Sequence, residues 1–140
     1  MRFWDSSAIV PLVVQEATRT RMRALFQQDP QILVWWGTRL EILSALSRRE
    51  RELSIPTAQI THVVELTKQL TAEWDEVLPT DAVRQVAERL LRTHPLRAAD
   101  SLQLAAALVA ADHDPATLEF VCLDTRLADA AHREGFTVLD

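Results

Sequence analysis

The sequence RFWDSSAIV, residues 2–10, places an acidic residue, Asp5, in the middle of an apolar stretch. Residues 2–5 predict a short buried strand that ends at this acid. Glu41, Asp100 and Asp124 also stand beside apolar runs, and no Lys or Arg follows a pattern that would pair with all four acids. Carboxylates are rarely buried without a partner, and a cluster of unpaired ones suits a hard divalent cation. The sequence therefore predicts metal-dependent phosphoryl chemistry.

Short apolar runs alternate with helical patterns along the rest of the chain, which indicates a parallel sheet covered on both faces. The expected fold class is α/β, a three-layer α/β/α sandwich around a short parallel sheet. Thr38 is expected to cap its helix, with Glu41 as the second member of a capping box. Strands are expected at residues 2–5, 32–36, 76–78, 119–124 and 136–139, and helices from near Pro11 and at 16–28, 38–52, 56–74, 80–93, 98–111 and 126–134.

Length and composition limit the class of protein. With 140 residues, 48% of them hydrophobic, we expect a single domain over residues 1–140 with an ordinary core. The chain has 15 basic and 20 acidic residues, a net charge of −5, so nucleic-acid binding requires local positive charge or a metal ion. Cys122 is the only cysteine, which excludes an intrachain disulfide and disfavours a cysteine-based zinc site.

No membrane or export segment is expected from the sequence. The apolar runs stay short of the ~18 residues that a membrane span needs. Asp5 and Pro11 interrupt the early apolar stretch, where a signal peptide would lie. We therefore expect a cytoplasmic protein.

The four acids are expected to meet at one edge of the sheet. Asp5 and Asp124 fall at the carboxyl ends of predicted strands, and Glu41 and Asp100 fall in the first turns of helices. Active sites of open parallel sheets lie outside the carboxyl ends of the strands. Each acid alone has a structural alternative, because carboxylates also cap helices and Arg97 can pair with Asp100. Their joint placement favours a functional site.

Other residue types give weaker signals. The four histidines, His62, His94, His113 and His132, share no metal-ligand spacing and are expected to be exposed or at helix ends. Trp35 and Trp36 are interpreted as core residues of a strand rather than as base-stacking platforms. Two groups of arginines, near residues 19–23 and 48–51, are interpreted as solvated helix faces.

Four motifs in order resemble those of one family. Residues 3–10, FWDSSAIV, resemble the opening strand of PIN-domain ribonucleases, especially VapC-type toxins, and residues 40–46, LEILSAL, look like their glutamate helix. Residues 96–107, LRAADSLQLAAA, are similar to their third acidic motif, and residues 123–127, LDTRL, to their closing motif. The resemblance covers nearly the whole chain. One departure is Cys122, where many members have Thr or Ser.

The resemblance implies a PIN-like fold and a metal-dependent endoribonuclease that acts as the toxin of a toxin–antitoxin pair. It implies that Asp5, Glu41, Asp100 and Asp124 are the catalytic residues and hold Mg²⁺ or Mn²⁺, with Ser6 and Thr125 as supporting hydroxyls. It also implies an RNA substrate, a cognate antitoxin protein and a homodimer. For the antitoxin we expect a groove made by part of an apolar set on the first two helices: Val10, Leu12, Val13, Met22, Leu25 and Phe26.

Two other classes of function remain as alternatives. A receiver-like phosphorylation module also uses an acidic pocket on a parallel sheet, but it needs a Lys at a strand end, and Lys68 lies within a predicted helix. A degenerate PIN fold that binds RNA or protein without catalysis keeps the sheet and loses the metal. Such a chain normally lacks one or more of the acids, and all four are present here.

Overall fold

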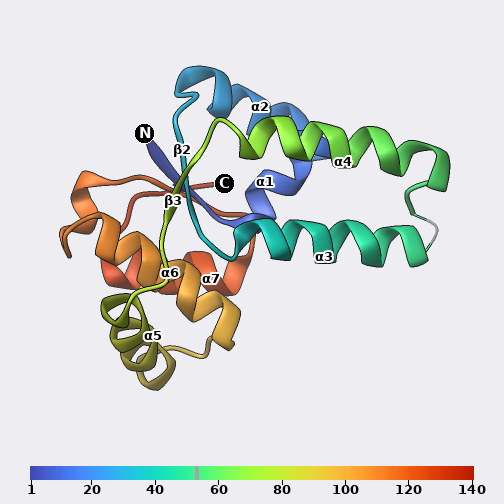
Figure 1. The fold of residues 1–140 in the computed structure, drawn as a ribbon. Coiled ribbons are helices and arrows are strands. Elements are labelled where there is room, and N and C mark those ends of the chain that lie inside the picture. The colour runs from blue at the N-terminus through green and yellow to red at the C-terminus, as the bar shows by residue number, and fades with distance from the viewer. Residues whose placement is uncertain (53) are drawn as a thin grey trace.

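The structure is a computed structural model that describes residues 1–52 and 54–140. A five-stranded parallel sheet, in the order β3-β2-β1-β4-β5, has helices on both faces (Figure 1). This confirms the predicted three-layer α/β/α sandwich. The elements are β1 (Arg2–Trp4), α1 (Ser6–Val13), α2 (Arg19–Gln28), β2 (Ile32–Trp35), α3 (Thr38–Arg51), α4 (Thr57–Thr71), β3 (Asp75–Val77), α5 (Asp81–Thr93), α6 (Ala98–Ala110), a 3₁₀ turn (Pro115–Thr117), β4 (Phe120–Val121), α7 (Thr125–Glu134) and β5 (Val138–Leu139).

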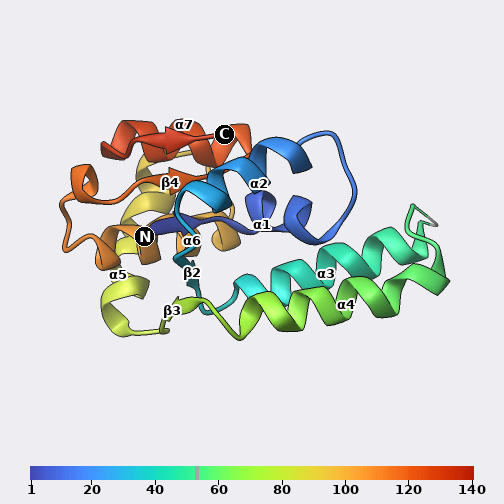
Figure 2. The same cartoon turned by 90° about the horizontal axis from the view of Figure 1, so that it is seen from above.

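Strand β1 explains why the sheet needs a helical layer on each face. Successive side chains of a strand point to opposite faces, and Phe3 and Trp4 are both fully buried. Phe3 belongs to a core cluster with residues of α5, α6 and α7, and Trp4 belongs to a second cluster with residues of α1, α3 and α4. Figure 2 shows the two helical groups on either side of the strands. The continuously apolar strands therefore follow from burial on both faces.

Helix α6 is the most buried helix, as its apolar sequence predicts. It packs against α5, β2, β3 and α7, and every residue from Gln103 to Leu108 is buried. Its many alanines allow a close approach to the sheet, because a small side chain leaves little space between two elements. None of the described helices has both the length and the apolar character that crossing a membrane requires.

The first helices differ from the expectation. Pro11 lies inside α1, which begins at Ser6, rather than near the start of a helix. Asp5 accounts for the earlier start, because its carboxylate accepts the Ser7 backbone N–H and caps the helix. Proline removes one intrahelical hydrogen bond, and α1 ends two residues later, at Val13. Helix α2 begins at Arg19 and not at residue 16.

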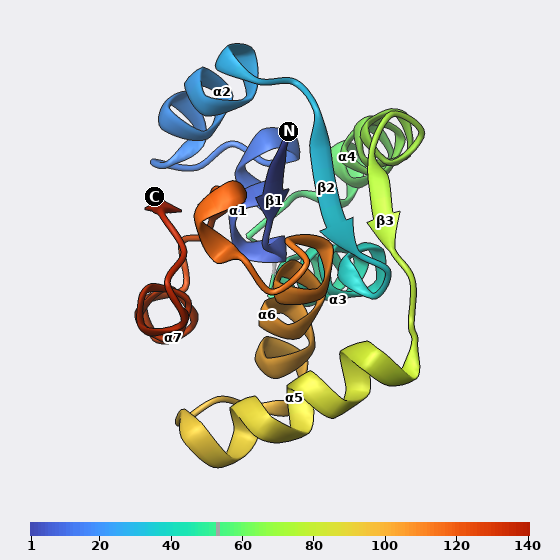
Figure 3. The ribbon, with the colours of Figure 1, turned by 90° about the vertical axis from the view of Figure 1, so that its left-hand side faces the viewer.

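All strands run in the same direction, so their carboxyl ends form one edge. Figure 3 shows β1, β2 and β3 pointing toward the same end of the molecule, where α3 begins. Helices α1, α3 and α7 each start two to four residues after a strand ends at this edge. The edge therefore carries three helix N-termini, whose first backbone N–H groups have no partner within the helix itself.

The β2–α3 junction depends on a close packing contact that can be tested with Gly37→Ala. A Cβ at position 37 would lie 2.6 Å from Nε1 of the buried Trp35 ring, although the backbone angles, φ −74 and ψ −12, suit alanine. Because the ring must shift, we expect the free energy of unfolding to fall by about 1–3 kcal/mol in urea titrations. An unchanged unfolding midpoint would show that the ring has space to move.

Candidate functional site

The four predicted carboxylates surround the carboxyl edge of the sheet. Asp5 follows β1 directly, and its backbone N–H donates to the carbonyl oxygen of Val121 in β4 at 2.9 Å. Asp124 lies three residues after that carbonyl and begins α7. Glu41 and Asp100 lie in the first turns of α3 and α6. The parallel sheet and the helix starts thus bring all four to one rim.

Asp5 is the most deeply placed of the four, with 4% of its surface exposed. Its Oδ2 accepts the Ser7 backbone N–H at 2.9 Å. Burial raises the pKa of this carboxyl group to about 6; the hydrogen bonds from Ser7 oppose the shift, and the negative charge of Glu41 adds to it. Among the residues that the structure describes, no ion pair compensates this carboxylate for its loss of water.

Glu41 is held by two donors on a single oxygen. Its Oε2 accepts the Ser6 hydroxyl at 2.7 Å and the Gln103 side-chain amide at 3.0 Å. Burial raises the pKa of Glu41, these two hydrogen bonds lower it, and the charge of Asp100 raises it further. The capping-box interpretation of Glu41 is wrong: α3 is capped by Gly37 without a side-chain hydrogen bond, and Thr38 instead bonds to Gln103.

Asp100 and Asp124 line one hollow of about 360 Å³, together with Arg97, Thr125 and Arg126. Asp100 accepts the backbone N–H of Arg97 at 3.2 Å through Oδ2. Asp124 accepts the backbone N–H of Leu127 at 2.8 Å through Oδ1 and so caps α7. The capping alternatives for these two acids are therefore real, but each uses only one carboxylate oxygen, and Arg97 forms no ion pair with Asp100 among the described residues.

The second oxygen of each acid is free within residues 1–52 and 54–140. In that part of the chain no hydrogen bond reaches Oδ1 of Asp5, Oε1 of Glu41, Oδ1 of Asp100 or Oδ2 of Asp124. No ion pair among the described residues involves any of these side chains. Four unpaired carboxylates with open oxygens are suitable ligands for a hard divalent cation.

The spacing of the acids limits how a cation can bind. Among the described residues, no three His, Cys, Asp or Glu side chains stand close enough to enclose a metal ion. Mg²⁺ is commonly held by one or two carboxylates and keeps several of its own waters. The donor set therefore fits an open, water-rich site better than a closed cage.

Ser7 and Gln103 are residues of this site that the sequence interpretation missed. The Ser7 hydroxyl accepts the backbone N–H groups of Leu123 and Asp124, at 2.9 and 3.2 Å, and so ties α1 to the end of β4. Gln103 is 1% exposed and links Thr38 to Glu41. The sequence does mark Gln103, because it is a polar residue inside the otherwise apolar run of residues 102–108.

Two predicted supporting residues differ in their contacts. Ser6 donates to Glu41, as stated above, whereas Thr125 makes no hydrogen bond to the acids in the described part of the chain. Cys122 is fully buried, with Sγ 3.9 Å from Oδ2 of Asp5 and 3.4 Å from the Asp124 carbonyl oxygen. Burial, with the charge of Asp5, raises the pKa of this thiol, so it remains neutral beside the acids.

Comparisons with known proteins agree with this architecture. The chain is 30% identical over 136 residues to Ribonuclease VapC45 of Mycobacterium tuberculosis (strain CDC 1551 / Oshkosh), covering 97% of this chain and 92% of that protein. The same values hold for Ribonuclease VapC49 of Mycobacterium tuberculosis (strain ATCC 25618 / H37Rv). No protein-family model matches the chain.

A likeness also appears among solved structures. A chain of a toxin-antitoxin complex from Klebsiella pneumoniae superposes with a TM-score of 0.68 at 15% identity, over 100% of this chain and 97% of that one. At this identity the likeness shows a shared fold. The two relatives show that the chain belongs to the VapC ribonuclease family.

The raised pKa of Asp5 predicts a pH-dependent stability in metal-free buffer. Because the folded pKa, about 6, lies above the ordinary value, about 3.9, the folded state binds the proton more tightly. The resulting stability is fully present below pH ~4 and is lost as the pH rises through 6. Asparagine at position 5 can still cap α1 but carries no charge. We therefore expect the free energy of unfolding of Asp5→Asn to exceed that of the wild type by up to about 3 kcal/mol at pH 8.

The difference in the free energy of unfolding between Asp5→Asn and the wild type should shrink toward zero as the pH falls to 4. Urea unfolding at several pH values measures this difference. Asp112→Asn is a suitable control, because Asp112 is exposed and its φ of 49 is one that asparagine tolerates. A variant that is less stable than the wild type at every pH would mean that capping outweighs the burial of charge.

Proposed function

We propose that this protein is a metal-dependent endoribonuclease that hydrolyses RNA phosphodiesters and acts as the toxin of a toxin–antitoxin pair. Membership of the VapC ribonuclease family supports the reaction and the RNA substrate. In this proposal residues 1–140 form a single PIN-like domain. The catalytic residues Asp5, Glu41, Asp100 and Asp124 hold Mg²⁺ or Mn²⁺.

The observation that carries the proposal is the uncompensated negative charge at the carboxyl edge. Burying a carboxylate without a partner is costly, and the chain places two raised-pKa acids, Asp5 and Glu41, beside two further acids. Arg97 and Arg126 line the same hollow as Asp100 and Asp124, yet in the described part of the chain neither forms an ion pair with these acids. A cost of this kind is expected where charge is needed for binding a cation.

The chain's own residues prepare the site for an in-line attack of water on a phosphodiester. Ser6 and Gln103 fix the orientation of Glu41, and Ser7 fixes the backbone of Asp124 relative to Asp5. The bound cation supplies a Lewis acid and a more acidic water. Arg97 and Arg126, which line the hollow beside Asp100 and Asp124, are positioned to neutralise the phosphate charge.

One observation favours the alternative of a PIN-fold module that binds RNA or protein without catalysis. The described acids do not form a closed metal site, and a binding module has no need of one. The two functions differ in their response to Mg²⁺ or Mn²⁺, so a single set of measurements separates them.

Metal dependence is tested by melting and by cleavage on the same samples. Millimolar Mg²⁺ or Mn²⁺ should raise the melting temperature of the wild type by a few degrees, because the cation binds only the folded state. The same metal should start cleavage of single-stranded RNA. Asp5→Asn and Asp100→Asn should lose at least about a hundredfold in cleavage rate, and Asp112→Asn should behave as the wild type.

Two outcomes would count against the proposal. If the wild type is folded and neither Mg²⁺ nor Mn²⁺ changes its melting temperature, the rim has no cation site. A wild type that binds metal but leaves RNA intact, and does not slow growth when it is expressed alone, supports the binding module instead.

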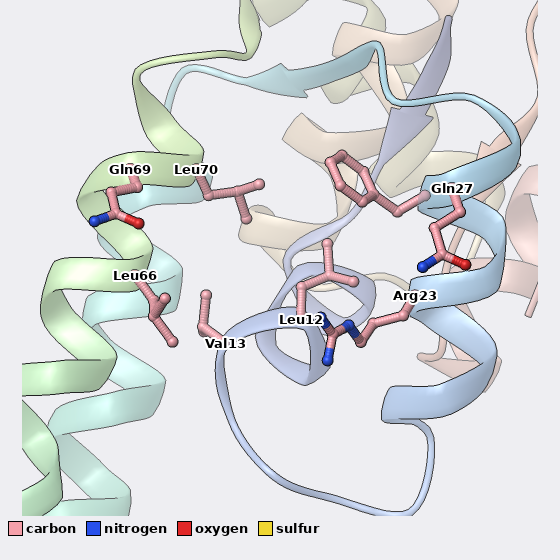
Figure 4. Close-up of a pocket in the computed structure, with 8 residues that line it drawn as sticks. Leu12, Val13, Arg23, Gln27, Leu66, Gln69 and Leu70 are labelled. Carbon is pink, nitrogen blue, oxygen red and sulfur yellow. The ribbon is translucent and has the colours of Figure 1, made fainter.

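A groove on the α1–α2–α4 face is our candidate site for the antitoxin. It has a volume of about 280 Å³ and is lined by Leu12 and Val13 of α1, Phe26 of α2 and Leu66 and Leu70 of α4, with Arg23, Gln27 and Gln69 at its polar parts. Figure 4 shows the α4 side chains across from those of α2, with Leu12 and Val13 between them. The groove thus uses only part of the expected apolar set: Leu12, Val13 and Phe26 line it, whereas Val10, Met22 and Leu25 do not.

We propose that an apolar segment of the cognate antitoxin fills this groove, with one of its basic side chains reaching the acidic rim. Leu66→Asp places a charge among the groove leucines and should weaken the complex with the co-expressed antitoxin by at least about tenfold. Leu91→Asp is the matched control on α5, where the leucine is 43% exposed. Affinity is measured by titration, and free toxin activity by RNA cleavage.

A second copy of this chain, in a homodimer, is the alternative occupant of the same groove. Light scattering of the isolated protein distinguishes a homodimer that uses the groove from a groove kept for the antitoxin. If Leu66→Asp turns a dimer into a monomer while antitoxin affinity is unchanged, the groove is the dimer interface and the antitoxin site lies elsewhere.

A further inference from the structure

Trp36 is exposed at the end of β2, contrary to the expectation that both tryptophans belong to the core. Trp35 is 6% exposed, whereas Trp36 is 47% exposed. Full burial of a large aromatic side chain is favourable, and the chain does not use that gain here. An exposed indole ring beside a functional site is therefore a candidate contact for a ligand.

The exposed ring is held in place by its neighbours. The Trp36 backbone N–H donates to the Val77 carbonyl oxygen of β3 at 3.0 Å. The rings of Trp35 and Trp36 meet edge to face, with centroids 6.5 Å apart and an interplanar angle of 72°. Trp35 is fixed in turn by the core and by its close contact with Gly37. Trp36 is thus exposed on a rigid support, which lowers the entropy cost of binding.

Trp36 shortly precedes the start of α3, the helix that carries Glu41. The carbonyl oxygen of Gly37, the following residue, accepts the backbone N–H groups of Leu40 and Glu41 at 3.0 and 3.2 Å. Leu40 is 62% exposed, and Leu78, which follows the Val77 partner of Trp36, is 60% exposed. We call Trp36, Leu40 and Leu78 the rim patch.

One residue of the rim patch, Leu40, lines a groove that also contains Glu41 and basic residues of α3. It has a volume of about 590 Å³ and is lined by Leu40, Glu41, Ser6 and Arg48, among others. Arg39 and Arg48 on α3, like Arg97 and Arg126 across the rim, form no ion pair among the described residues. Aromatic surface next to unpaired arginines is the combination that single-stranded nucleic acid requires, since bases stack and phosphates need positive charge.

We propose that Trp36 stacks on an unpaired nucleobase of the RNA substrate and so positions the neighbouring phosphodiester over the four carboxylates. This inference rests on the proposed ribonuclease function and extends it to a substrate-positioning residue. In this proposal a planar base covers the indole ring, and its phosphate pairs with Arg39 or Arg48 of α3. Trp35 supports the Trp36 ring edge to face, and any unpaired base can stack on such a ring. We therefore expect a preference for single-stranded RNA and little preference for a particular base.

The binding arm of the test compares Trp36→Ala, Trp36→Phe and Leu91→Ala with the wild type. A fluorescent single-stranded RNA oligomer is titrated in EDTA, where metal-dependent cleavage is absent. Trp36→Ala should raise Kd roughly five- to hundredfold, the range found for loss of one stacked base. Trp36→Phe keeps a ring and should stay within about threefold, and Leu91→Ala should match the wild type.

The cleavage arm uses an oligomer in which one nucleotide beside the cut bond lacks its base. In the wild type the abasic substrate should lower kcat/KM by about the same factor as Trp36→Ala does on the intact substrate. In Trp36→Ala the abasic substrate should cause little further loss, because the two changes remove the same contact. Melting temperatures confirm that each variant is folded.

The outcomes separate this inference from the proposed function. If the wild type neither cuts nor binds RNA, both fail together. If it cuts RNA and Trp36→Ala binds and cuts as well as the wild type, the inference is wrong and the ribonuclease function stands. If Trp36→Ala instead changes the oligomeric state in light scattering, with RNA affinity unchanged, the rim patch is an interface between copies of this chain.

Discussion

The buried charge of Asp5 is the constraint on which the rest of the structure depends. Its carboxylate stands at the end of the central strand, 4% exposed and, within residues 1–52 and 54–140, without an ion-pair partner. One oxygen begins α1 by accepting the Ser7 N–H, which directs the helix away from the rim and places Ser6 against Glu41. The Ser7 hydroxyl then holds the end of β4. A single acid thus organises three of the elements that form the site, at the cost of an uncompensated charge.

The same division of labour recurs in the other acids. Asp100 and Asp124 each give one oxygen to a backbone N–H at a helix start, and Glu41 gives one to Ser6 and Gln103. Helix N-termini favour negative charge, so they offset part of the repulsion between carboxylates that lie at one edge. The oxygens that remain are the ones available to a cation, and the arginines outside the rim remain available to a polyanionic substrate. Structural and functional roles are therefore compatible in one side chain.

The sequence predicted the layers of the fold well, because continuously apolar strands leave few alternatives to a covered parallel sheet. It predicted the rim from Asp5 and Asp124, since strand ends are easy to recognise. It failed where tertiary contacts override local signals. Thr38 has the residue type of a helix cap, but its hydroxyl accepts a hydrogen bond from Gln103. Pro11 is typical of a helix start, but it lies inside a helix that Asp5 caps. Trp36 continues an apolar strand in sequence, yet β2 ends one residue earlier and leaves it exposed. Ser7 and Gln103 gained their roles only from partners more than 60 residues away.

Proton release on metal binding tests the central claim, that the unpaired acids form one cation site, most directly. Mn²⁺ binding is followed by calorimetry at pH 6 and pH 8, each in two buffers of different ionisation enthalpy. Because Asp5 has a pKa of about 6, half of the molecules carry its proton at pH 6, and binding should release about half a proton per ion. At pH 8 the release should be close to zero. Equal heats in both buffers at pH 6, or binding that survives in Asp5→Asn with unchanged affinity, would contradict the account.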